Sequence, residues 1–210
     1  MTSDTLSTSD KTLPGQFDLR ISEQAAIALA DQIECALLAC DCDCRLLYVN
    51  RAGRRALEMG NAIRLADERV RCSGTTQEEW SAAVRDAAID QHRRLFWVGT
   101  PGDRTMIIAM PILIEGSANP TAIVMLGRRS VCSRLGLELL ASRHALSFAE
   151  RRAFGALIAN ASPREIAAMH GVTVAVVHAQ LQSVRDKMGV RSIDALLLRA
   201  AQVPPVTSWQ

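Results

Sequence analysis

The stretch that decides the fold of this chain is SPREIAAMHGVTVAVVHAQLQSVRDKMGVRS, residues 162–192. Its first half carries the signals of a short capped helix. Ser162 is a natural N-cap, Pro163 suits the first helical position, and Glu165 completes a capping box. Gly171 can adopt the left-handed conformation that ends such a helix. These residues therefore predict one short helix that stops at a glycine turn.

A second, longer helix follows the glycine, with Thr173 as its N-cap and Gly189 as its end. Its apolar residues fall on one face at the 3.6-residue period. They are Val177, Leu181, Val184 and Met188. A short helix, a turn with glycine and a longer amphipathic helix form the helix-turn-helix arrangement, whose second helix lies in the DNA major groove. The pattern predicts an all-α helix-turn-helix domain.

The segment from Leu146 to about Ala200 resembles the C-terminal domain of LuxR/NarL-type transcription regulators. The matching residues are Leu146-Ser147, Glu150, Glu165-Ile166-Ala167, Gly171, Val177, Leu181 and Lys187-Met188-Gly189-Val190. The resemblance covers about a quarter of the chain. It implies a transcription regulator that binds double-stranded DNA as a homodimer. Since a dimer binds half-sites with matching symmetry, the expected operator is an inverted repeat.

The resemblance also implies residue roles. The groove-facing positions fall on His178, Ala179 and Gln182, of which His178 and Gln182 are candidates for base contacts. The candidates for phosphate contacts are Thr173, Arg185, Lys187 and Arg191. From Leu146 to Ala200, seven Lys or Arg residues stand against four acidic residues, a balance of +3 that gives a modest footprint for nucleic acid.

The second helix departs from the family pattern. Family members usually carry Thr-Val-Lys/Arg and then a His two residues later, where this chain has Val176, Val177, His178 and Gln180. None of the groove-facing positions is Lys or Arg, although most DNA affinity comes from cations on phosphates. One alternative is therefore a protein-interaction regulator, in which a degenerate helix-turn-helix docks on another protein.

The preceding part of the chain predicts an α+β layer. Two short strands around an Asp-containing turn predict a hairpin over 35–50. Helices are expected over 51–58 and from Thr76 to about Gln91, and 63–71 is ambiguous and allows a short strand. Three further strands are expected over 94–100, 104–114 and 121–128. Together these strands predict a five-stranded antiparallel sheet with helices.

This order of elements resembles a PAS-type sensor domain. The resemblance lies in Leu37-Leu38-Ala39-Cys40-Asp41 and in Leu47-Tyr48-Val49-Asn50-Arg51-Ala52: a hydrophobic strand, Asp, a turn, then a strand ending in Asn before a helix. It implies a sensory or dimerisation domain with a small-molecule or protein effector. The sequence points to no particular cofactor. The acid and Lys pattern of a receiver domain does not stand out, and the few aromatic residues disfavour an acyl-homoserine-lactone domain.

We expect five segments along the chain. They are a disordered arm over 1–21, a PAS-like domain over 22–130, a linker helix over 131–145, a helix-turn-helix domain over 146–202 and a tail over 203–210. The chain is 49% hydrophobic and carries a net charge of +2. It shows neither a secretory signal nor an apolar run of membrane-spanning length, so we expect a cytoplasmic protein with reduced thiols.

Cys40, Cys42 and Cys44 form the most unusual cluster. Alternate residues on a strand share a face, so three thiols would converge and hold a soft metal or respond to oxidants. Structural zinc sites usually place two or more residues between ligands, which favours small core or turn residues instead. A thiol or metal sensor stays an alternative. No P-loop, G-x-G-x-x-G or G-x-S-x-G motif occurs, and we predict no enzyme activity.

Overall fold

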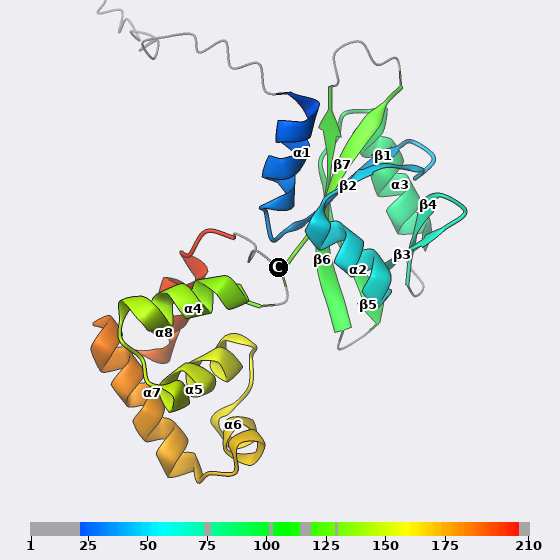
Figure 1. Ribbon diagram of the computed structural model, residues 1–210. Coiled ribbons are helices and arrows are strands. Elements are labelled where there is room, and N and C mark those ends of the chain that lie inside the picture. Colours follow the sequence, from blue (N-terminus) through cyan, green and yellow to red (C-terminus); the bar gives the residue numbers. More distant parts are fainter. Residues whose placement is uncertain (1–21, 74–76, 101–102, 114–118, 129, 206–210) are drawn as a thin grey trace, which may run out of the picture.

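The computed structural model describes residues 22–73, 77–100, 103–113, 119–128 and 130–205. Figure 1 shows two units joined by the segment between β7 and α4. The sheet unit contains α1 (Glu23–Asp31), β1 (Ala36–Asp41), β2 (Leu46–Val49), α2 (Arg51–Met59), β3 (Ile63–Ala66), β4 (Arg69–Cys72), α3 (Gln77–Ala88), β5 (Arg94–Thr100), β6 (Asp103–Ile112) and β7 (Thr121–Leu126). The helical unit contains α4 (Arg134–Arg143), α5 (Phe148–Ile158), α6 (Pro163–His170), α7 (Val174–Met188) and α8 (Ile193–Ala201).

The five-stranded antiparallel sheet expected from the sequence is confirmed, in the order β2-β1-β7-β6-β5. The long-range pairing of β1 with β7 places the first and last strands of the sheet unit side by side, with Leu37 opposite Met125. The ambiguous stretch 63–71 belongs to a separate two-stranded hairpin, β3–β4. Asp67 and Glu68 form its turn with positive φ values of 51° and 60°.

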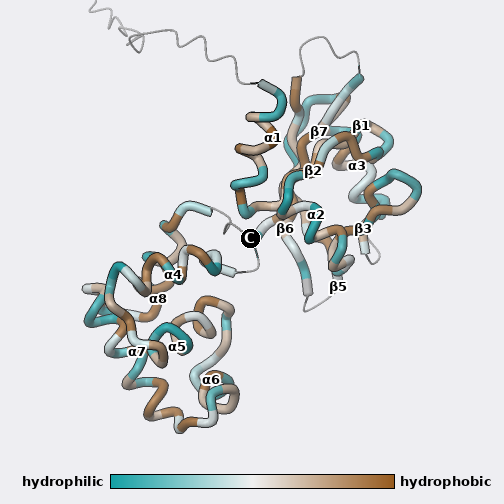
Figure 2. Tube along the Cα trace, in the orientation of Figure 1, coloured by the Kyte–Doolittle hydropathy of each residue, from teal (hydrophilic) through white to brown (hydrophobic). Residues whose placement is uncertain are grey.

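Strand alternation explains why one face of the sheet is buried. Leu38, Ile107 and Val124 point into a core that α3 closes with the fully buried Trp80. The indole of Trp80 meets the ring of Phe96 edge-on, with ring centroids 6.2 Å apart. Figure 2 shows hydrophobic residues in the strands that carry this core.

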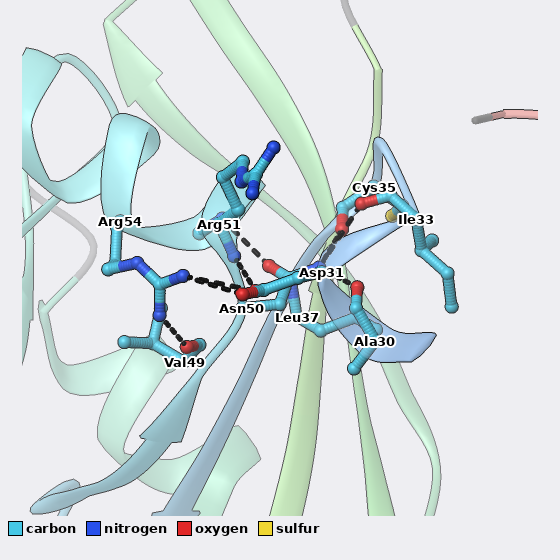
Figure 3. Close-up of polar contacts among 10 residues, drawn as sticks. Ala30, Asp31, Ile33, Cys35, Leu37, Val49, Asn50, Arg51 and Arg54 are labelled. Atoms are coloured by element: carbon cyan, nitrogen blue, oxygen red, sulfur yellow. Dashed lines mark hydrogen bonds and ion pairs between the residues drawn. The ribbon is translucent and has the colours of Figure 1, made fainter. Parts of the chain in front are cut away.

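The buried side chain of Asn50 joins α1, β1 and α2 (Figure 3). Its Oδ1 accepts hydrogen bonds from the backbone N–H groups of Leu37 at 3.0 Å and Gly53 at 2.8 Å. Its Nδ2 donates to the carbonyls of Ala30, Ile33 and Cys35 at 3.1, 3.3 and 2.9 Å. The amide therefore caps α2 and also holds the connection between α1 and β1.

The helical unit has a core of its own, in which α5, α6, α7 and α8 bury Phe154, Ile166, Val177 and Leu196. The helix expected over 131–145 is present as α4, with Ser133 as its N-cap. It does more than link the units, because Leu137 and Leu140 pack against this core and the buried Cys132 belongs to it.

Three expected features fall partly or wholly outside the described residues: the arm over 1–21, the N-cap Thr76 and the end of the tail from 206 onwards. The described start of the tail makes contacts. Val203 packs against the helical core, and the carbonyl of Pro205 accepts a 2.9 Å hydrogen bond from the backbone N–H of Glu34. Within the described ranges, no helix combines the length and the apolar character needed to cross a membrane.

We predict that Asn50→Ala lowers the free energy of unfolding of the sheet unit by roughly 2–4 kcal/mol. The substitution leaves the N–H groups of Leu37 and Gly53 without their acceptor, and each unsatisfied buried group costs about 1–3 kcal/mol. Urea denaturation followed by tryptophan fluorescence measures the change. Asn61→Ala is the control, because that side chain is exposed. Equal stability of the two variants would contradict the role of the amide.

Candidate nucleic-acid interface

The helix starts expected around residue 162 are confirmed. Ser162 and Glu165 form a reciprocal capping box at the start of α6, with the Glu165 carboxylate accepting the Ser162 backbone N–H at 2.7 Å. Gly171 ends α6 in the left-handed conformation, with φ 66°. Thr173 then caps α7 by accepting the N–H of Val176. Two helices are thus joined by a three-residue connection, 171–173.

The two faces of α7 differ in burial and chemistry. The apolar face expected from the sequence is confirmed, since Val177, Leu181, Val184 and Met188 are all buried. The groove-facing candidates His178, Ala179 and Gln182 are exposed on the opposite side of the helix. The structure therefore leaves all three groove-facing candidates accessible on α7.

A row of hydrogen bonds fixes the side chain of Gln182. Its amide nitrogen donates to the Asp186 carboxylate at 2.7 Å, and its carbonyl oxygen accepts from Arg185. A second nitrogen of the Arg185 guanidinium lies 3.4 Å from the carbonyl of Arg191. Arg185 and Gln182 thus form a connected polar surface beside the backbone of Arg191, and Asp186 adds a negative charge to it.

Lys187, another phosphate candidate, is tied into the helical unit. Its ammonium donates to the Glu150 carboxylate at 2.7 Å and to the carbonyl of Ala145 at 3.1 Å. The carbonyl of Lys187 in turn lies 3.1 Å from Nδ1 of His144. A phosphate contact by Lys187 would have to compete with these internal partners.

Glu150 is the centre of this arrangement and was noted in the sequence only as a matching residue. Its carboxylate is buried and accepts from Lys187, from the Ser183 hydroxyl at 2.7 Å and from the Ser147 backbone N–H at 2.6 Å. The hydrogen bonds from Lys187 and then Ser183 lower its pKa to about 2. The i, i+4 spacing of Ser183 and Lys187 was a usable signal that both face one partner.

The strand alternation that would gather three thiols ends at Asp41. Cys40 is buried on the inner face of β1, whereas Cys42 and Cys44 lie in the following turn, where Cys44 has φ 63°. Burial raises the pKa of the Cys40 thiol to about 12 and raises that of Cys44 as well, which disfavours the thiolate needed for metal binding. Among the described residues, no group of three or more His, Cys, Asp or Glu side chains is arranged to hold a metal ion.

Comparison with known proteins finds no matching family model and no matching curated protein. Among solved structures, the chain is similar to Vibrio cholerae VqmA in a complex with ligand and DNA, at 18% identity, 88% of this chain, 91% of that chain and a TM-score of 0.41. It is also similar to the VqmA dimer without target DNA, at 16% identity, 84% and 86% coverage and a TM-score of 0.38. A third similar structure is the PAS domain of Bordetella pertussis BvgS, at 16% identity, 59% and 94% coverage and a TM-score of 0.32.

We predict that Glu150→Gln destabilises the helical unit at neutral pH by about 2 kcal/mol, because it replaces charge-assisted hydrogen bonds. The pKa of Glu150 is lowered on folding, so its contribution is complete above about pH 4.5 and is lost as the pH falls towards 2. Unfolding followed by far-UV circular dichroism across this range should show a shallower loss of stability in the variant. Asp194→Asn, at an exposed position of α8, is the control and should keep the wild-type slope.

Proposed function

We propose that this chain is a DNA-binding transcription regulator whose sheet unit acts as a PAS-like sensory and dimerisation domain. The observation that carries the proposal is α7, which buries its apolar face and leaves His178, Ala179 and Gln182 exposed after a glycine turn. A helix that presents short polar side chains in this way fits the width of the DNA major groove.

In this proposal the base contacts come from His178 and Gln182. An amide side chain pairs well with adenine, and the bonds to Arg185 and Asp186 already hold the amide of Gln182 in one orientation. Phosphate contacts come from Arg185, Arg191 and Thr173. With few free cations on this surface, a single unit binds weakly and two copies on an inverted repeat give the working affinity.

A dimer is supported by the uncovered face of the sheet. Leu95 and Trp97 of β5 are 65% and 50% exposed, and Met106 of β6, directly opposite Trp97, is 38% exposed. Ile27 and Leu29 of α1 add further exposed apolar side chains. The neighbouring apolar side chains of β5 and β6 mark an interaction surface, and a second copy of the chain is the proposed partner.

The second candidate function is docking on another protein. Met169 at the end of α6 is 58% exposed and Val176 at the start of α7 is 41% exposed. These apolar side chains beside the connection suit a protein partner better than a phosphate backbone. The two functions differ in salt dependence. DNA binding releases condensed counterions, so its affinity falls steeply as the salt concentration rises, whereas protein docking releases none.

We predict that the double variant His178→Ala, Gln182→Ala folds normally but loses discrimination among DNA sites. Each good base contact contributes roughly 1–3 kcal/mol. Fluorescence anisotropy with fragments selected from genomic DNA measures operator and random-sequence binding over a salt series. If the variant keeps its operator preference, α7 does not read bases.

The same salt series tests the phosphate contacts. Arg191→Ala should weaken all sequences alike and reduce the salt slope by about one. Arg199→Ala, at an exposed position on α8, is the matched control and should leave the slope unchanged. If the DNA affinity of the wild-type protein does not fall steeply with salt concentration, the protein-docking function is favoured instead.

We further predict that Trp97→Glu converts the dimer to a monomer at micromolar concentration, because a charge would be buried in the proposed interface. Sedimentation velocity measures the change. Ile89→Glu places the same charge at an exposed apolar position in the turn that follows α3 and should leave the dimer intact. A dimer that survives Trp97→Glu would exclude this face of β5 as the interface.

A further inference from the structure

The sheet unit contains a cavity of about 280 Å³ at the end that faces the connection to the helical unit. Its apolar wall comes from Ala36 of β1, Ala56 and Met59 of α2, and Leu126 of β7. This volume lies near the lower end of the range of ligand pockets, about 300–1,000 Å³, so the cavity suits a small organic molecule.

One acceptor in the cavity wall is left without a donor. Oε2 of Glu34 is buried and has no hydrogen-bond partner among the described residues. The backbone N–H of Glu34 is already used by the carbonyl of Pro205. A buried carboxylate oxygen without a donor is costly, so a ligand that supplies an N–H group would gain a charge-assisted hydrogen bond.

The charges around the cavity favour a cation. Arg128 also lines it, but this residue is exposed, whereas the free oxygen of Glu34 is buried. A negatively charged ligand inside the cavity would be repelled by Glu34, and its attraction to Arg128 would be weakened by solvent. A positive group would be attracted where screening is least.

We propose that this cavity binds a small organic amine, with its apolar body against Ala56, Met59 and Leu126 and its cationic nitrogen on Glu34. The site would be the effector site of the proposed sensory domain, so its regulatory meaning rests on the proposed function. Binding of the amine itself does not rest on the proposed function, because it is measured on the protein without DNA.

The cavity also touches the start of the helical unit. Ser130 and Cys132 line it, and Cys132 is buried within the core that contains α5 and α7. Cys132 packs tightly against the first turn of α4, since a methyl group on Gly136 would lie 2.5 Å from the Cys132 sulfur. A ligand seated between Glu34 and Cys132 therefore contacts residues of both units, and its occupancy changes the connection through which a sensory domain would act.

The test uses three probes that share an indole ring and differ in charge: tryptamine, tryptophol and indole-3-acetate. Isothermal titration calorimetry on the full chain is expected to show tryptamine binding at least tenfold more tightly than tryptophol, with indole-3-acetate weakest. Glu34→Gln should remove the preference for tryptamine. Glu58→Gln, at an exposed position on α2 outside the cavity wall, should keep it.

A second variant tests the location. Ala56→Phe fills the cavity and should abolish binding of tryptamine and tryptophol, while far-UV circular dichroism confirms the fold. Absence of tryptamine binding, equal binding of the three probes, or a tryptamine preference that survives Glu34→Gln would overturn the proposal. Loss of DNA binding in the salt series would overturn the proposed function and leave the calorimetric result unaffected.

Discussion

The orientation of α7 depends on one buried carboxylate, that of Glu150. It receives the ammonium of Lys187 and the hydroxyl of Ser183 from α7 and the backbone N–H of Ser147 from the start of α5. Because the group is buried, loss of Lys187 would leave a charge without compensation and loss of Ser183 would remove a donor, so the arrangement tolerates little sliding of α7 against α5. The exposed face of α7 is therefore held at a defined angle by residues on its other side.

The sheet unit uses the same principle at Asn50. One buried amide satisfies backbone groups from the α1–β1 connection, from β1 and from the first turn of α2. Buried polar networks of this kind specify one arrangement because every member must be satisfied at once. The two networks thus position the two parts on which the proposals rest: the end of the sheet unit that carries the cavity, and the helix that carries the candidate DNA contacts.

Local signals were enough to predict most elements. The capping box at Ser162 and the left-handed Gly171 concern contacts within a few residues, and the strands of the sheet were predicted from short apolar runs between turn residues. The sequence did not resolve the β3–β4 hairpin, because the second turn residue is Glu68, whereas glycine is usual at a positive φ in such turns. It also did not place α4 in the helical core. Pairing of Lys187 with Glu150 spans 37 positions, and the cavity beside Glu34 joins segments about a hundred residues apart; such contacts leave no local pattern.

In the proposed DNA-binding role, the residues that position α7 differ from those left to contact DNA. Lys187 of α7 has internal partners, and Gln182, Arg185 and Asp186 are hydrogen-bonded to one another. What remains for a phosphate backbone is a small positive surface around Arg185 and Arg191, beside a negative charge. Since counterion release scales with the number of phosphates neutralised, such a surface gives one copy little affinity. In the proposed function, affinity for DNA has to come from holding two copies at the right spacing. An effector bound in the proposed cavity then acts on that affinity through the sheet unit and its connection to α4.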